Sequence, residues 1–140
     1  MTQAFAVIEQ IEAPPDQVWA VLTDWRRAPE WMPGIEHLSA SGATEVGTTL
    51  TFRARGKERP SEVTALTVGQ SINLRSIQGP VQADYTYSCR PSGGGTSVTL
   101  DADCQISGII GLFAPLIRFA IARSDSPQLS NLKRLIESEL

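Results

Sequence analysis

The sequence predicts an α+β fold, in which a curved antiparallel sheet of about seven strands wraps around a long C-terminal helix, with two short helices after the first strand. Between residues 35 and 106, apolar and polar residues alternate in several runs, as in strands that bury one face. After Gly108 the apolar period becomes helical and stays so to the end. Leu, Ile, Val and Phe make up a quarter of the 140 residues, enough for a core without crosslinks. We expect one domain spanning residues 1–140.

The first strand and the two short helices are predicted from the alternation of apolar and polar residues and from the positions of prolines. Residues 5–11 alternate apolar and polar side chains, which predicts a strand that ends before Pro14. A helix is expected over 15–23, because Pro15 suits a first helical turn, where its missing N–H has no partner to lose. A second short helix over 25–32 ends at Pro33 and Gly34.

The central region reads as a meander of antiparallel strands. The clearest strands are 81–90 and 98–106, joined by a hairpin in which Gly93–Gly95 supply the positions of positive φ. Residues 49–55 alternate clearly, and weaker strand patterns mark 35–40, 61–68 and 72–77.

Four basic residues recur at period 2 opposite Leu50, Phe52 and Ala54: Arg53, Arg55, Lys57 and Arg59. If the apolar side faces inward, these cations form a solvated outer face whose charges discourage pairing between sheet edges. Attraction to an anionic lipid or an acidic partner is the alternative.

The C-terminal helix is expected to be interrupted at Pro115 and again near Pro127. Its first part, 109–122, is apolar nearly all round with Arg118 as the only charge, so it should be covered on more than one side. The second part places Leu129, Leu132 and Ile136 on one face and is an ordinary amphipathic helix.

Composition excludes several classes of function. The net charge of −3 disfavours nucleic acid as a partner, and one histidine with two cysteines cannot form a metal cage, so no metal and no cofactor are expected. The most apolar window has 14 residues, against the ~18 or more that a membrane helix requires, so we expect a cytoplasmic protein without stable membrane insertion. Folding about the glycine hairpin sets Cys89 opposite Val98, away from Cys104, which predicts free thiols.

Short motifs carry a resemblance to a known family: Ala13-Pro14-Pro15-Asp16-Gln17-Val18-Trp19, Asp24-Trp25, Trp31-Met32-Pro33-Gly34-Ile35, Val46-Gly47 and Leu132-Lys133-Arg134-Leu135-Ile136-Glu137. They resemble polyketide cyclase/dehydrase-like proteins of the START and Bet v 1-like (SRPBCC) superfamily. The resemblance covers essentially the whole chain and implies the helix-grip fold. It also implies one apolar cavity of the kind found in lipid carriers, sterol binders, hormone receptors, polyketide cyclases and ubiquinone-binding proteins.

Strand parity, the helix and the resemblance together give a candidate cavity wall: Trp31, Phe52, Val63, Leu74, Tyr85, Tyr87, Leu100, Ala102, Phe113, Ile117 and Ile121. Tyr85 and Tyr87 are candidate polar handles, because a buried phenol needs a hydrogen-bond partner, either a ligand or another protein group. Arg75 and Arg118 are the charged residues to check for inward placement. The alternative is a solid core, which periodicity alone does not distinguish from a cavity.

The sequence therefore favours a carrier or sensor, monomeric or homodimeric, for a small hydrophobic molecule such as a lipid, quinone or polyketide. The first alternative is a cyclase or dehydratase that needs no cofactor and orients a reactive chain in a shaped pocket. The second is a protein-interaction module with a filled core. Catalytic residues stay unassigned, because the chain shows no nucleophile elbow and no phosphate loop.

Overall fold

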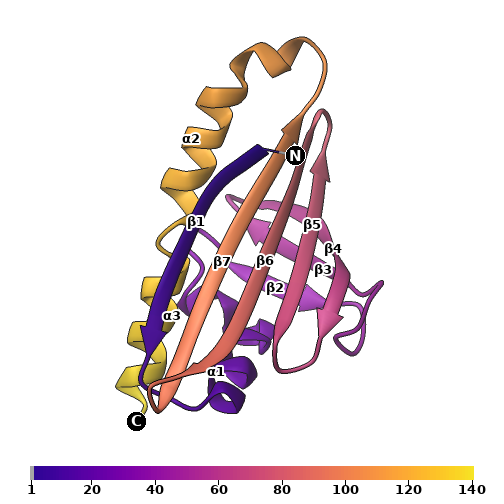
Figure 1. Ribbon diagram of the computed structural model, residues 1–140. Helices are drawn as coiled ribbons and strands as arrows, with labels where there is room; N and C mark the ends of the chain where they lie inside the picture. The colour runs from indigo at the N-terminus through magenta and orange to yellow at the C-terminus, as the bar shows by residue number, and fades with distance from the viewer. Residues whose placement is uncertain (1) are drawn as a thin grey trace.

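The computed structural model describes residues 2–140 and centres on one seven-stranded antiparallel sheet, in the order β1-β7-β6-β5-β4-β3-β2 (Figure 1). Consecutive strands from β2 to β7 are neighbours, and β1 returns to pair with β7. The strands are β1 (Thr2–Ile11), β2 (His37–Ala40), β3 (Thr49–Ala54), β4 (Lys57–Thr67), β5 (Ser71–Gln78), β6 (Val81–Ser92) and β7 (Gly95–Ile106). The predicted fold class is confirmed.

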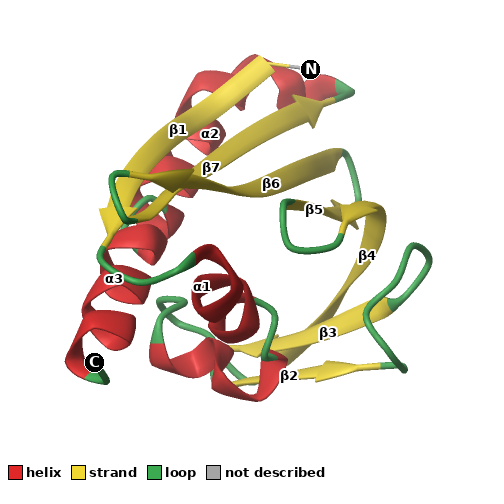
Figure 2. Cartoon of the chain, turned by 60° about the horizontal axis from the view of Figure 1, so that its bottom comes forward, coloured by secondary structure: helices red, strands yellow, loops and turns green. Residues whose placement is uncertain are grey.

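The helices lie across the open side of the curled sheet (Figure 2). Two short ones follow β1, and the C-terminal part is divided into three. They are α1 (Pro15–Leu22), the 3₁₀ helix η1 (Trp25–Glu30), the 3₁₀ helix η2 (Ile109–Phe113), α2 (Ala114–Asp125) and α3 (Gln128–Ser138). Pro15 opens α1, as its fixed φ favours.

The β6–β7 hairpin has the predicted register and faces. Cys89 pairs with Val98 and Tyr85 with Ala102, so Tyr87, Leu100 and Ala102 share the buried inner face. Asp101 and Asp103 alternate with them on the outer face. Cys89 and Cys104 are both buried free thiols, as predicted.

The expectation that Arg53, Arg55, Lys57 and Arg59 form one outer face is wrong, because a hairpin turn falls between them. The turn lies at Arg55, which has φ 53°, and Gly56, and it pairs Ala54 with Lys57 and Phe52 with Arg59. Residues directly opposite each other lie on the same face of a sheet, so Arg59 is on the inner face with Phe52. The alternation of inward and outward side chains does not continue through a two-residue turn. Of the four basic residues, only Arg53 therefore points outward as predicted.

The start of the C-terminal helical region is much more exposed than its composition predicts. Leu116 and Phe119 of α2 expose 66% and 62% of their surface, and in η2 Leu112 exposes 81%. The expectation that this part is covered on more than one side is wrong. The reason is that α2 packs along β1 at the sheet edge, and no other part of residues 2–140 lies over its outward face.

The core occupies the end of the molecule where α1 and α3 meet the sheet. Val18 and Leu22 of α1 and Leu129, Leu132 and Ile136 of α3 are fully buried there. Each such side chain stabilises the fold by about 1.5–3 kcal/mol relative to exposure. No helix within residues 2–140 is long and apolar enough to cross a membrane.

Gly95 is required for a close approach rather than for a positive φ. Gly93 and Gly94 have φ of 54° and 84°, as predicted for the hairpin, but Gly95 does not share that conformation. A Cβ atom at position 95 would overlap the backbone carbonyl oxygen of Ile11, where β1 ends.

We expect Gly95→Ala to destabilise the protein by about 1–3 kcal/mol, because backbone at the end of β1 has to move to admit the methyl group. Gly42→Ala is the matched control, since its Cβ would meet nothing within 4 Å. Urea unfolding of the two variants beside the wild type measures the difference. Equal midpoints for the two variants would contradict the proposed contact.

Candidate functional site

A cavity of about 200 Å³ lies on the inner side of the curled sheet. Its wall is mainly apolar with a few polar groups, the usual composition of a small-molecule site. The lining residues are Met32, Ile35, Phe52, Ala54, Arg59, Ser61, Leu74, Ser76, Gln78, Tyr85, Tyr87, Asp125 and Gln128.

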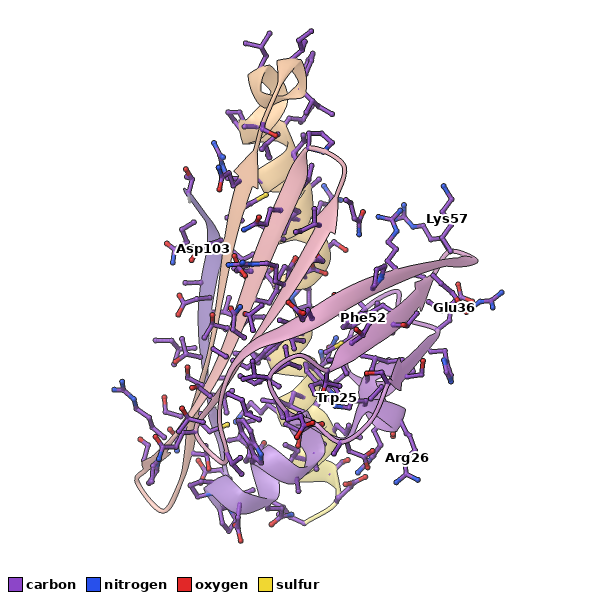
Figure 3. All side chains as sticks on the ribbon, turned by 90° about the vertical axis from the view of Figure 1, so that its right-hand side faces the viewer. Trp25, Arg26, Glu36, Phe52, Lys57 and Asp103 are labelled. Atoms are coloured by element: carbon purple, nitrogen blue, oxygen red, sulfur yellow. The ribbon has the colours of Figure 1, made fainter. Side chains whose placement is uncertain are left out.

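Four neighbouring strands supply most of this wall. β3, β4, β5 and β6 each contribute alternate residues, which is why their side chains point to one side. Figure 3 shows Phe52 on the arm that β2, β3 and β4 form, away from Asp103 at the other side of the sheet. The segment after η1 adds Met32 and Ile35, and the junction of α2 with α3 completes the wall.

Two hydrogen bonds in the cavity wall join tyrosines of β6 to the residues where α2 ends and α3 begins. The Tyr85 hydroxyl donates to Oδ2 of Asp125, the last residue of α2. The Tyr87 hydroxyl donates to Oε1 of Gln128, the first residue of α3, at 2.6 Å. Both predicted handles therefore have partners within the protein, and both partners line the same cavity.

Burial shapes the protonation of this polar cluster. It raises the pKa of Asp125 above its usual range, although hydrogen bonds from Tyr85, Gln128 and Ser124 act to lower it. Burial, together with the nearby Asp125, also raises the pKa values of Tyr85 and Tyr87, so both phenols stay protonated. A carboxyl group with a raised pKa inside an apolar cavity is able to hold or release a proton near a bound molecule.

A second group of polar residues in the cavity wall comes from β4 and β5. The guanidinium of Arg59 donates to Oε1 of Gln78, and both residues are exposed at their outer parts while lining the cavity. Ser61 and Ser76 lie further along the same two strands. The cavity therefore has a polar mouth at one end and the Asp125 cluster at another, with apolar walls between them.

The second charged network lies on the outer face and does not contact the cavity. Arg75 donates to Asp84 with Nε at 2.9 Å from Oδ1, and Asn73 donates to the same oxygen at 3.0 Å. Burial raises the pKa of Asp84, but these hydrogen bonds outweigh it and the pKa lies below its usual range. Of the two arginines to be checked, Arg75 is thus outward. Burial raises the pKa of the Cys104 thiol, and Arg118 lies close enough to oppose that rise.

The structure distributes the candidate wall residues over three places. Phe52, Leu74, Tyr85 and Tyr87 line the cavity. Four others are buried in the packing behind it: Trp31, Val63, Leu100 and Ala102. Trp31 packs edge-on against Tyr87, with ring centroids 6.0 Å apart.

The helical candidates lie outside this cavity. Phe113 is 57% exposed on η2, and Ile117 and Ile121 are half-buried on α2. The reason is geometric: only the last residue of α2 reaches the cavity, because the rest of the helix runs along β1.

Sequence reasoning misses six polar lining residues: Arg59, Ser61, Ser76, Gln78, Asp125 and Gln128. Arg59 falls on the predicted outer face because the pattern does not locate the turn at Gly56. Asp125 and Gln128 flank the break at Ser126 and Pro127, and that proline is the available signal that the helix changes direction there. Among residues 2–140, no group of three or more metal-binding side chains comes together.

Comparisons with known proteins agree with this architecture. A family model described as polyketide cyclase / dehydrase and lipid transport matches residues 2–137. A search of functionally curated proteins returns no match.

Solved structures similar to the chain include TTHA0849 from Thermus thermophilus, with 19% identity, a TM-score of 0.76 and coverage of 96% of this chain and 97% of that one. The di-domain ARO/CYC StfQ of the steffimycin biosynthetic pathway has 14% identity and a TM-score of 0.77, over 96% of this chain and 50% of that one. A START superfamily protein from Mycobacterium smegmatis has 14% identity and a TM-score of 0.71, over 97% and 98%. At these identities the likeness shows the fold. Because the family model covers nearly the whole chain, the protein belongs to the polyketide cyclase/dehydrase and lipid transport family.

Proposed function

We propose that the protein binds a small, mostly apolar molecule that carries a carbonyl or hydroxyl group, and that it acts as a carrier or sensor of that molecule. The observation that supports this is the apolar cavity with the Tyr85–Asp125 pair in its wall. Pockets of this kind gain affinity from apolar contact and orientation from a few polar groups.

The size of the cavity narrows the ligand class. Its volume of about 200 Å³ is below the range of about 300–1,000 Å³ typical of drug-sized ligands. One or two fused rings fit inside, and a longer chain would extend past Arg59 and Gln78 at the mouth. A ring system of polyketide or quinone type therefore fits better than a whole lipid.

Asp125 gives the site a way to recognise either kind of oxygen. In its protonated form the carboxyl group donates to a ligand carbonyl, and in its ionised form it accepts from a hydroxyl. The raised pKa brings the two forms closer in population at neutral pH. Gln128 beside it supplies both an amide donor and a carbonyl acceptor.

Binding is tested first by native mass spectrometry of the purified protein, followed by organic extraction of any bound molecule. The expected result is an apolar ring compound bearing a carbonyl or hydroxyl group. Titration with 2-naphthol, followed by its fluorescence, then measures affinity directly, and naphthalene serves as the comparison without a polar group. Tighter binding of 2-naphthol than of naphthalene is expected, and the reverse order would contradict the polar role of Asp125.

Filling the cavity should weaken ligand binding without unfolding the protein. Ser76 lines the cavity from β5, so Ser76→Phe places a ring inside it, and we expect the affinity for 2-naphthol to fall by about tenfold or more. Ser88→Phe is the matched control, because Ser88 lies in β6 next to inward-facing Tyr87 and so points to the outer face. Unchanged affinity in Ser76→Phe would place the binding site elsewhere.

The second candidate function is that of a cofactor-independent cyclase or dehydratase. The observation that favours it is that Asp125 and Tyr85, a proton acceptor and a hydrogen-bond donor, lie in the wall of the same mainly apolar cavity. Aldol cyclisation needs a base for the proton next to a carbonyl and a donor that stabilises the enolate oxygen. The carboxylate of Asp125 would take the proton, and the Tyr85 hydroxyl would turn to the oxygen.

A single-step probe tests whether Asp125 is a working base. In 5-nitrobenzisoxazole, the carboxylate would take the proton on the ring carbon, and the electron pair would form a nitrile as the N–O bond breaks to release a phenolate. We expect turnover about 100-fold above that of Asp125→Asn, rising with pH to a plateau as Asp125 ionises. In Tyr85→Phe the midpoint should move to higher pH, because the Tyr85 hydroxyl lowers the pKa of Asp125.

The control for this experiment is Asp101→Asn, which removes a carboxylate from the outer face. Its turnover should equal that of the wild type. Equal turnover of Asp125→Asn and wild type would eliminate Asp125 as a base and leave the carrier function.

Asp125 should also lower stability at high pH. Its pKa is raised in the folded state, so folded protein holds the proton more tightly than unfolded protein does. The free energy of unfolding therefore falls as pH rises from the ordinary carboxyl value through the raised one. We expect Asp125→Asn to melt a few degrees above the wild type at about pH 8, with the difference shrinking toward about pH 4. Thermal unfolding of both proteins across this pH range measures the difference in melting temperature. A difference that grows as the pH falls would contradict the prediction.

A further inference from the structure

Exposed apolar side chains gather at one end of the molecule. Six of the eleven large apolar side chains exposed among residues 2–140 fall within the eleven positions from 109 to 119, and we call these six the apolar tip: Ile109, Ile110, Leu112, Phe113, Leu116 and Phe119. Figure 1 shows η2 and the start of α2, in orange, extending past the ends of the strands. Single exposed apolar residues are normal, but a contiguous group of this size marks an interaction surface.

The charge of this segment differs from that of the rest of the protein. Residues 104–124 contain Arg118 and Arg123 and no acidic residue, so the segment carries +2 while the rest of the chain carries −5. Neither arginine forms an ion pair within the described residues 2–140. The apolar tip is therefore accompanied by uncompensated positive charge on an otherwise acidic molecule.

We propose that the apolar tip docks the protein on a lipid bilayer that contains anionic lipids. Leu112 to Phe119 span about 10 Å along a helix axis, which matches the depth of about 5–10 Å that interfacial helices reach. Arg123 follows Phe119 by about one turn, so it lies at the level of the headgroup phosphates when Leu112 and Phe119 are inserted. Arg118 lies near Cys104 of β7 and adds its positive charge to the same end of the molecule.

The charge pattern favours a bilayer over a second copy of the chain. In a two-fold symmetric contact the same surface meets itself, so the arginines of one copy would approach those of the other. Residues 104–124 offer no carboxylate to pair with them. An anionic bilayer supplies an apolar interior that covers the exposed side chains of the apolar tip. It also supplies the negative charge that would pair with the two arginines.

Flotation with vesicles tests the proposal. Wild-type protein is mixed with vesicles of phosphatidylcholine alone or of phosphatidylcholine with phosphatidylserine, and the bound fraction is measured. We expect binding to the anionic vesicles and about tenfold weaker binding to the neutral ones. The double variant Leu116→Ser/Phe119→Ser should lose about tenfold or more of the partition coefficient, because two apolar side chains no longer insert. Arg118→Gln/Arg123→Gln should lose the preference for anionic lipid.

Val68→Ser is the matched control, since Val68 is 77% exposed at the turn between β4 and β5. Its vesicle binding should equal that of the wild type. Affinity for 2-naphthol should be unchanged in Leu116→Ser/Phe119→Ser, which shows that the fold and cavity are intact. Absence of wild-type binding to anionic vesicles would overturn the proposal. So would a dimer, detected by sedimentation velocity, that the same double variant dissociates, since that result identifies a second copy as the partner.

Discussion

The break between α2 and α3 determines what the concave side of the sheet contains. Pro127 lacks a backbone N–H, and its ring clashes with the carbonyl four residues earlier, so the helix is interrupted there. Below the break, α3 packs into the core against α1, and above it α2 follows β1 along the sheet edge. The two residues that flank the break, Asp125 and Gln128, therefore face inward together and meet Tyr85 and Tyr87.

Stability and function are divided between the two helices on either side of the break. Leu129, Leu132 and Ile136 are fully buried and close one end of the molecule, so this end can support an incompletely packed cavity beside it. Burying the carboxyl group of Asp125 works against folding, because the charged form loses hydration that three hydrogen bonds only partly replace. Strained or costly groups of this kind are expected at functional sites, where the rest of the fold compensates for them. The outer network of Arg75 and Asp84 shows the contrast, since there an ion pair lowers the pKa of the carboxyl group.

Most of the fold is predictable because strand periodicity and proline placement act locally. The faces of β6 and β7 follow from alternation, and the resemblance in the motifs around Trp19 and Trp31 points to the right family. The site is predictable only in part. Phe52, Leu74 and the two tyrosines line the cavity, but a single unlocated turn at Gly56 reverses the side assigned to Arg59. Asp125 escapes prediction because helical periodicity carries no information on where a helix leaves the sheet. The apolar composition of 109–122 suggests burial, although composition does not say whether protein or another partner provides the cover.

The apolar tip and the cavity are joined by one rigid element, and this bears on how a ligand would enter. α2 begins among the exposed apolar residues and ends at Asp125 in the cavity wall. Apart from the hydrogen bond between Asp125 and Tyr85 at its C-terminal end, α2 packs mainly on β1 at the sheet edge and has no fully buried residue, so it is held less firmly than α3 in the core. An interaction at the tip that moves α2 would also move Asp125 relative to Tyr85, because a helix transmits displacement along its length. The wall that closes the cavity is thus the element best placed to respond to a surface, while Leu132 and Ile136 keep the opposite end fixed.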